Sequence, residues 1–148
     1  MMLGPRDLLS KHIRTYTFIC MSPLPHCDAR MSLDVKQLVR MSPEERERLM
    51  SQVFSQLLTM SREQVVSTLV EFMKQLSAAA NDDQYKEVCK TNVGIIARLP
   101  DATAKQVIQM RLEAQSRLPP DLRERDQRVL TKAIQESPYS SRIMSLLK

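Results

Sequence analysis

Residues 41–64 read MSPEERERLMSQVFSQLLTMSREQ and contain the same helix-start motif twice, 19 residues apart. In both copies a serine stands three residues before a side chain that can return a hydrogen bond to it: Ser42 precedes Glu45, and Ser61 precedes Gln64. This spacing is a capping box, in which the serine hydroxyl and the later side chain each accept a hydrogen bond from a backbone amide of the other residue. The stretch therefore predicts one helix that ends shortly before residue 60 and a second that begins directly after it.

Similar helix-start motifs recur along the rest of the chain. They begin at residues 41, 60, 80, 99 and 118, so the intervals are 19, 20, 19 and 19 residues. Pro43 and Pro120 suit the first position of a helix, where no amide hydrogen is needed, and acidic residues follow in the first turns. The pattern predicts five helices, and connections of about two to four residues make consecutive helices antiparallel.

Apolar residues between these motifs recur with the period of a helix and not with that of a strand. The helix that follows Ser61 has apolar side chains over the widest arc, so we expect it to be the most buried. Asn92 and Gly94 interrupt the next helix, and we expect Gly94 to mark a close approach between helices, with a local bend as the alternative.

The predicted fold is all-α, a compact antiparallel bundle of five to six helices with a period of about 19 residues. The alternative is a short HEAT-like helical-repeat solenoid, in which successive helix pairs stack on one another. A chain of 148 residues is long enough to bury one core. Its two glycines form no G-x-G-x-x-G or G-x-x-x-x-G-K-[ST] motif, which excludes folds that hold nucleotides on such loops.

Three parts of the chain differ in composition. Residues 1–30 contain three of the eight prolines, both histidines and no glutamate. We expect them to be a flexible N-terminal extension, which is either a targeting segment or a stretch upstream of the true start at Met31. Residues 31–137 form the predicted helical domain. Pro138 interrupts the last long helix, so residues 138–148 are expected to be a short amphipathic C-terminal tail.

The C-terminal tail carries four apolar side chains between two basic residues. A segment this short is unstable as an isolated helix, so its apolar side chains must be covered by the bundle or by a partner. Their spacing is typical of a helix that inserts into a groove of another protein. The candidate partner-binding residues are Ile143, Met144, Leu146 and Leu147.

The chain has a formal net charge of +5, and residues 98–132 hold a local excess of bases. On one predicted helix, Arg123, Arg125 and Arg128 are the candidate residues for an anionic partner. Aromatic residues make up 4% of the chain and leave few platforms for stacking bases, so contact with RNA would be to phosphates and sensitive to salt. Elsewhere the two signs of charge are interleaved, as on an ordinary solvated surface.

No group of side chains in the sequence indicates catalysis. His12 and His26 lie in the N-terminal extension, away from a core that could orient them. Cys20 and Cys27, with His26 between them, lack a fourth zinc ligand and the usual spacing of zinc-binding cysteines. Cys89 falls on an apolar stripe, where we expect a buried and inert thiol. The sequence therefore predicts no enzyme activity, no metal and no cofactor.

The expected function is that of a non-enzymatic helical protein-protein interaction module: an adaptor, an assembly factor or a small subunit of a larger complex. Ten methionines favour this, because flexible thioethers are common on surfaces that accept partner helices, although methionines also fill gaps in a core. The alternative is a ribonucleoprotein component that binds phosphates through the basic helix. A protein partner is thus expected and a nucleic acid is possible, while the oligomeric state is left open.

The apolar run near the N-terminus is too short to span a membrane or to act as a signal peptide. The odd number of cysteines favours a reducing compartment. We therefore expect an intracellular, cytoplasmic protein, or a mitochondrial or other organellar one if residues 1–30 are a transit peptide.

Overall fold

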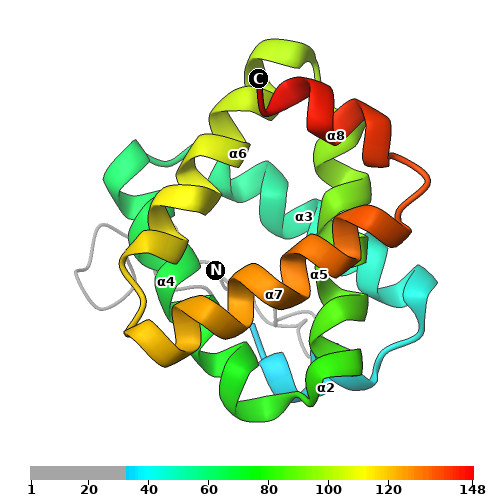
Figure 1. The fold of residues 1–148 in the computed structure, drawn as a ribbon, viewed down its shortest axis with the longest axis vertical. Helices are drawn as coiled ribbons and strands as arrows, with labels where there is room; N and C mark the ends of the chain where they lie inside the picture. The colour runs from blue at the N-terminus through cyan, green and yellow to red at the C-terminus, as the bar shows by residue number, and fades with distance from the viewer. Residues whose placement is uncertain (1–32) are drawn as a thin grey trace, which may run out of the picture. The chain divides into compact units, whose positions relative to one another are not determined.

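The computed structural model describes residues 33–148, and every regular element in this range is a helix (Figure 1). This confirms the all-α prediction, while the expected extension at residues 1–30 lies outside the described residues. The elements in chain order are α2 (Val35–Arg40), α3 (Pro43–Leu57), α4 (Arg62–Ala79), α5 (Asp82–Ala97), α6 (Asp101–Ser116), α7 (Pro120–Glu136) and α8 (Ser140–Leu146).

Helices α3 to α7 each begin two residues after the start of one of the five predicted helix-start motifs. Both predicted capping boxes are present, and a third opens α5. The two proline-rich starts differ, because α6 and α7 follow a proline that makes no side-chain cap. The three capping boxes join Ser42 to Glu45, Ser61 to Gln64 and Asn81 to Gln84.

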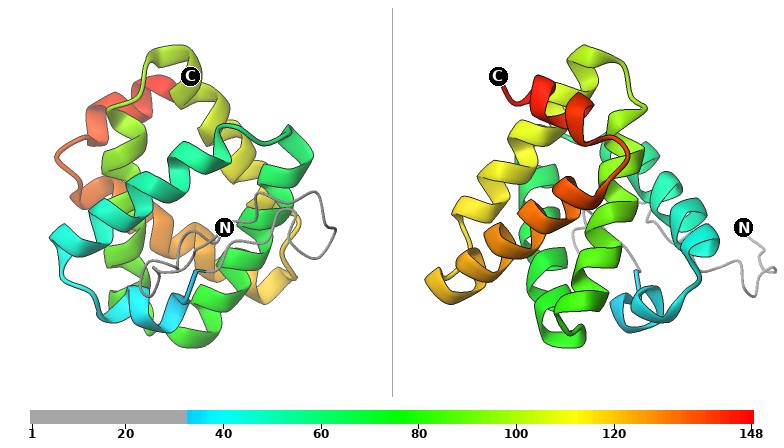
Figure 2. Two further views of the ribbon diagram at one scale, coloured as in Figure 1. Left: turned by 180° about the vertical axis from the view of Figure 1, so that it is seen from behind. Right: turned by 45° about the vertical axis from the view of Figure 1, so that its right-hand side comes forward.

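Helices two positions apart in the chain pack against each other most extensively. Helix α5 lies against α3 and α7, and α4 lies against α2 and α6. Figure 1 views this arrangement with α7 in front, and the reverse view in Figure 2 brings α3 forward. Helix α5 also contacts α2 and α8, each three positions away in the chain. Repeats in a solenoid contact only their neighbours, so these contacts fit a compact bundle better.

Helix α5, and not α4, is the most buried helix, which corrects the expectation from the sequence. Eight residues of α5 are buried against four of α4. In α4, Leu69, Val70 and Phe72 stay partly exposed. The reason is position: α5 has helices on several sides, and its last turn, 93–97, is buried all the way round. The arc of apolar side chains does not reveal how many neighbours a helix has.

The expected close approach of helices at Gly94 is also wrong. Helix α5 runs through this position without a break. A Cβ atom added at Gly94 would meet Tyr139 Cε2 at 3.6 Å and Arg98 Nη1 at 3.5 Å, which are ordinary contact distances. The neighbours of this position are thus the side chain of Arg98, which caps α5, and the Tyr139 ring between α7 and α8, and there is room for an alanine.

Arginines from other helices close the helix C-termini. With two glycines, the chain has little means of ending helices on a left-handed glycine, which is the common way to satisfy the last carbonyl groups. Arg46 of α3 is buried and takes this role for α2. Its guanidinium donates to the carbonyl oxygens of Leu38 at 3.2 Å and Met41 at 2.7 Å. The positive charge also suits the negative end of the helix dipole.

The same device joins α7 to the junction between α4 and α5. Arg125 donates to the carbonyl oxygens of Ser77 and Ala80, both at 2.7 Å, and to Asp82 Oδ1 at 2.9 Å. One guanidinium therefore binds the end of one helix and the first residue of the next. We call this arrangement a guanidinium clamp. Its cation also lies 5.0 Å from the centre of the Tyr85 ring, where a cation–π attraction operates.

A second guanidinium clamp joins α8 to the junction between α5 and α6. Arg142 donates to the carbonyl oxygens of Ala97 and Leu99, both at 2.8 Å, and to Asp101 Oδ1 at 2.7 Å. Asp82 and Asp101, the acidic partners of the two clamps, are 19 residues apart. The acidic partners of the clamps thus follow the helix period of the chain.

We expect replacement of Arg125 by methionine to lower the free energy of unfolding by about 2–3 kcal/mol, because two helix-terminal carbonyl groups lose a charged donor. Urea denaturation measures the change. Arg128→Met is the matched control, since its side chain is half exposed and donates to Asp82 alone. A loss of stability as large in the control as in Arg125→Met would contradict the importance of the carbonyl contacts.

Candidate functional site

An open groove of about 210 Å³ lies among α5, α6, α7 and α8. Helices α5, α6 and α7 each contribute two apolar side chains to its walls, α8 and the residue that follows it contribute one each, and four polar residues complete the lining. The apolar pairs are Val93 and Ile96, Ile108 and Leu112, Leu130 and Ile134, and Ile143 and Leu147; the polar residues are Arg111, Gln115, Gln127 and Thr131.

Exposed apolar side chains gather at this groove. In the part of the chain that the structure describes, the large apolar side chains that stay exposed are Leu58, Leu112, Met144 and Leu147. Leu112 and Leu147 line the groove, and Met144 lies on α8 next to Ile143, which lines it too. Leu58 follows the end of α3 and is not part of the lining. Two of these four exposed apolar side chains therefore lie in the groove.

A buried carboxylate lies next to the groove. Asp126 of α7 is fully buried, and its carboxylate accepts hydrogen bonds from three side chains. Arg111 donates through both terminal nitrogens at 2.8 Å, Gln115 donates at 2.7 Å, and the Tyr85 hydroxyl donates at 2.6 Å. Because Arg111 and Gln115 also line the groove, this network forms the polar part of its wall. It joins α5, α6 and α7 through one acceptor.

The charges of this network are stable at neutral pH. Burial by itself raises the pKa of Asp126, but the Arg111 charge and the hydrogen bonds outweigh it and hold the pKa below its usual value. Burial tends to lower the pKa of Arg111, and Asp126 overcomes this and raises it. Burial, followed by the Asp126 charge, raises the pKa of Tyr85. The network is therefore a neutral Arg111–Asp126 ion pair with a protonated tyrosine, and it serves to fix the three helices.

Cys89 is a free, buried thiol beside this network, as its apolar stripe indicates. Burial raises its pKa to about 12, so the reactive thiolate is absent at neutral pH.

The structure divides the four candidate partner-binding residues of the tail into two pairs. Ile143 and Leu146 are buried, with 3% and 6% of their surface exposed. Met144 and Leu147 are exposed, with 51% and 42%. Helix α8 thus packs one apolar face against α5, α6 and α7 and leaves a second apolar face open. The tail is both part of the bundle and one edge of the groove.

The candidate anionic-partner residues make hydrogen bonds within the fold. Arg125 forms the first guanidinium clamp, and Arg128 donates to Asp82 at 2.8 Å. Arg123 donates to the carbonyl oxygen of Leu118 at 3.1 Å, at the end of α6. An anionic partner stays a prediction, with its three arginines already bound to internal acceptors. Every residue has a backbone carbonyl group, so the pattern of charged side chains in the sequence does not show which carbonyl groups accept from these arginines.

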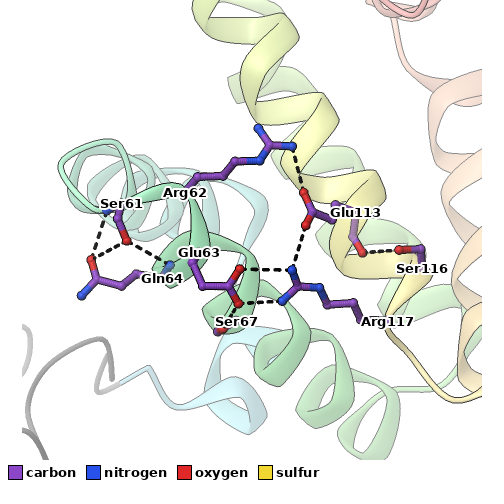
Figure 3. A network of polar contacts seen from close by, with 8 residues as sticks. All are labelled: Ser61, Arg62, Glu63, Gln64, Ser67, Glu113, Ser116 and Arg117. Carbon is purple, nitrogen blue, oxygen red and sulfur yellow. Dashed lines mark hydrogen bonds and ion pairs between the residues drawn. The ribbon is translucent and has the colours of Figure 1, made fainter.

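A surface network of four charges joins the start of α4 to the end of α6 (Figure 3). Glu63 accepts from both terminal nitrogens of Arg117 at 2.8 and 3.1 Å. Glu113 accepts from Arg117 and from Arg62, both at 2.8 Å. The hydrogen bonds from Arg117 and its charge lower the pKa of Glu63. Exposed pairs of this kind add little stability individually, and the network ties together two helices that pack against each other.

Within residues 33–148, no three potential metal-binding side chains come together, and no helix is long and apolar enough to cross a membrane. Comparisons with protein-family models, with curated proteins and with solved structures find no match.

We expect Asp126→Asn to lower the free energy of unfolding at neutral pH by about 3–5 kcal/mol, because it leaves the Arg111 charge buried without its counter-ion. Urea denaturation measures the effect, with the exposed Asp83→Asn as the control.

The same variant tests the pH dependence. Because folding lowers the pKa of Asp126, the stability that its ionisation provides is complete above the pKa of an unfolded aspartate, about 3.9. It is lost as the pH falls through the lower pKa of the folded state. The stability difference between the native chain and Asp126→Asn should therefore shrink below about pH 4. A difference that stays constant from pH 7 to pH 3 would contradict this assignment.

Truncation of a buried side chain of α8 should lower the free energy of unfolding more than truncation of an exposed one. Leu146→Ala is expected to lower the free energy of unfolding by about 2–4 kcal/mol, since it empties a buried position. Met144→Ala should change it by less than about 1 kcal/mol, because the side chain is half exposed. Thermal and urea denaturation of both variants measure this, and equal effects would show that α8 does not dock as described.

Proposed function

We propose that this chain is a non-enzymatic helical interaction module and that the groove among α5, α6, α7 and α8 docks an apolar helix face of another protein chain. The observation that carries the proposal is the position of the exposed apolar side chains. Leu112 and Leu147 line this groove, and the exposed Met144 follows the lining residue Ile143 in sequence. Their exposure costs solubility, and a docked partner would remove them from water.

The shape and chemistry of the groove support a helix as the docked element. Its volume of about 210 Å³ exceeds the ~150 Å³ of a cavity that holds benzene, so it has room for apolar side chains. The walls run along four helices, which suits anchors repeated at i, i+3 and i+4 on a partner helix. Its one charged lining residue, Arg111, is already paired with Asp126. An apolar partner surface therefore meets no unpaired charge in the groove.

The alternative function, phosphate binding through α7, has weaker support. Arg123 and Arg125 would have to give up contacts with helix-terminal carbonyl groups in order to bind a phosphate. Arg128 is half exposed, and within residues 33–148 its partner is Asp82. One accessible arginine is a small electrostatic footprint for a nucleic acid.

The free thiol of Cys89 accords with the proposed intracellular location, in a reducing compartment.

Capture experiments with the full chain test the proposal. Leu112 and Leu58 are both 41% exposed, but only Leu112 lines the groove. We expect proteins captured by the native chain, identified by mass spectrometry, to be lost with Leu112→Lys and retained with Leu58→Lys. Circular dichroism and melting confirm that both variants fold. Capture that is unaffected by Leu112→Lys, or equally reduced by Leu58→Lys, would contradict the groove as the docking site.

A further inference from the structure

We infer that α8 is a gate on the groove: it opens as a unit while α5, α6 and α7 stay folded, and its departure lengthens the groove. The opening is a property of the chain alone, whereas its role as a gate rests on the proposed function of the groove. The starting observation is that Ile143 of α8 and the following Leu147 form one wall. The other walls belong to helices of 16 or 17 residues, while α8 has seven.

Few side chains hold α8 in place. Two of its residues, Ile143 and Leu146, are buried, whereas α5 has eight buried residues. Met144 and the following Leu147 are half exposed, so α8 is covered on one face. Segments with few buried apolar contacts open locally at a lower free energy than the whole domain. A helix of seven residues is also unstable alone, so α8 unfolds when it leaves the bundle.

The guanidinium clamp that attaches α8 to the bundle faces water. Arg142 donates to the carbonyl oxygens of Ala97 and Leu99 and to Asp101, at the junction that lies next to α8 in Figure 1. The side chains of Arg142 and Asp101 are 36% and 77% exposed. Water can therefore replace these hydrogen bonds when α8 leaves, which limits the cost of opening. The clamp of Arg142 thus acts as the latch of the gate.

The connection between α7 and α8 allows α8 to move alone. Helix α7 ends at Glu136, and Pro138 has no amide hydrogen with which to continue it. The Tyr139 ring lies beside Gly94 of α5 and anchors the connection on the bundle. Residues 140–148 can therefore leave without unwinding α7.

Opening changes what the groove accepts. With α8 in place, the groove of about 210 Å³ has room for side chains of a partner. The surface that α8 covers, which we call its seat, already receives a helix, with Ile143 and Leu146 as anchors at i and i+3. Because Ile143 also lines the groove, the empty seat and the groove form one longer apolar channel. Helix α8 therefore competes with a partner helix that docks along this channel.

Native-state hydrogen exchange of the full chain, measured by NMR at a series of low urea concentrations, tests the opening. The amides of Ile143 and Leu147 donate to the carbonyl oxygens of Tyr139 and Ile143, so they report on α8. We expect these amides to be at least about a hundredfold less protected than the buried amides of α5. Their exchange should also depend less on urea, because opening of α8 exposes less surface than unfolding of the bundle.

Substitutions in the Asp126 network separate local opening from global unfolding. Asp126→Asn and the milder Tyr85→Phe remove contacts among α5, α6 and α7 that persist when α8 opens. We expect each to accelerate exchange of the α5 amides at least about tenfold. The α8 amides should stay within about twofold of their native rates, because the closed and open states are destabilised equally.

The latch has its own variant. Arg142→Met should accelerate exchange of the α8 amides at least about tenfold, because three hydrogen bonds to the guanidinium are lost. Arg128→Met is the matched control, since this half-exposed arginine binds Asp82, away from α8, and should leave the α8 amides within about twofold.

Exchange of the α8 amides that follows the α5 amides in rate, urea dependence and response to Tyr85→Phe would overturn the inference and leave the proposed function intact. If the chain captures a protein through Leu112, Arg142→Met should increase the amount captured, and an unchanged or smaller amount would refute the gate. Independent opening in a chain that captures nothing through Leu112 would refute the docking function and the gate together, and would retain the opening itself.

Discussion

The burial of one carboxylate constrains the positions of three consecutive helices. Asp126 of α7 has no contact with water, and a buried charge without partners costs several kcal/mol. Tyr85 of α5 and Arg111 and Gln115 of α6 all reach this carboxylate and offset that cost. Contacts in this bundle are most extensive between helices two positions apart in the chain. The Asp126 network adds hydrogen bonds between the adjacent helices α6 and α7. It also gives the groove a polar wall whose hydrogen bonds are already made.

Local sequence patterns predicted the helices and their starts, because capping boxes and prolines act within one turn. They did not predict the central place of α5 or the role of Asp126, which depend on residues as far as 41 positions away. One usable signal was present: Asp126, Val129 and Ala133 are spaced as i, i+3 and i+7 and share one buried face. Inside the charged run 123–128, however, Asp126 resembles part of a solvated surface. The groove needs four helices at once, so no single pattern could reveal it.

In this chain, which has two glycines, arginine side chains cap helix ends. Two glycines in the chain exclude glycine-rich loops, and they also imply that most helix ends need another cap. Arg125 and Arg142 provide it, each binding two carbonyl groups and an aspartate. A lysine would not replace them, because only the planar guanidinium offers several donors in fixed directions. An excess of bases near helix ends can therefore reflect internal caps instead of an anionic partner.

The two guanidinium clamps impose an order on how the fold is completed during synthesis. Helices α4 and α5 leave the ribosome before α7 and α8, so their terminal carbonyl groups stay hydrated until Arg125 and Arg142 are made. The partners of Asp126 likewise wait for α7. A repeat protein can gain structure one unit at a time as it grows. In this chain the caps of α4 and α5 and the Asp126 network are complete only once α7 and α8 have been synthesised.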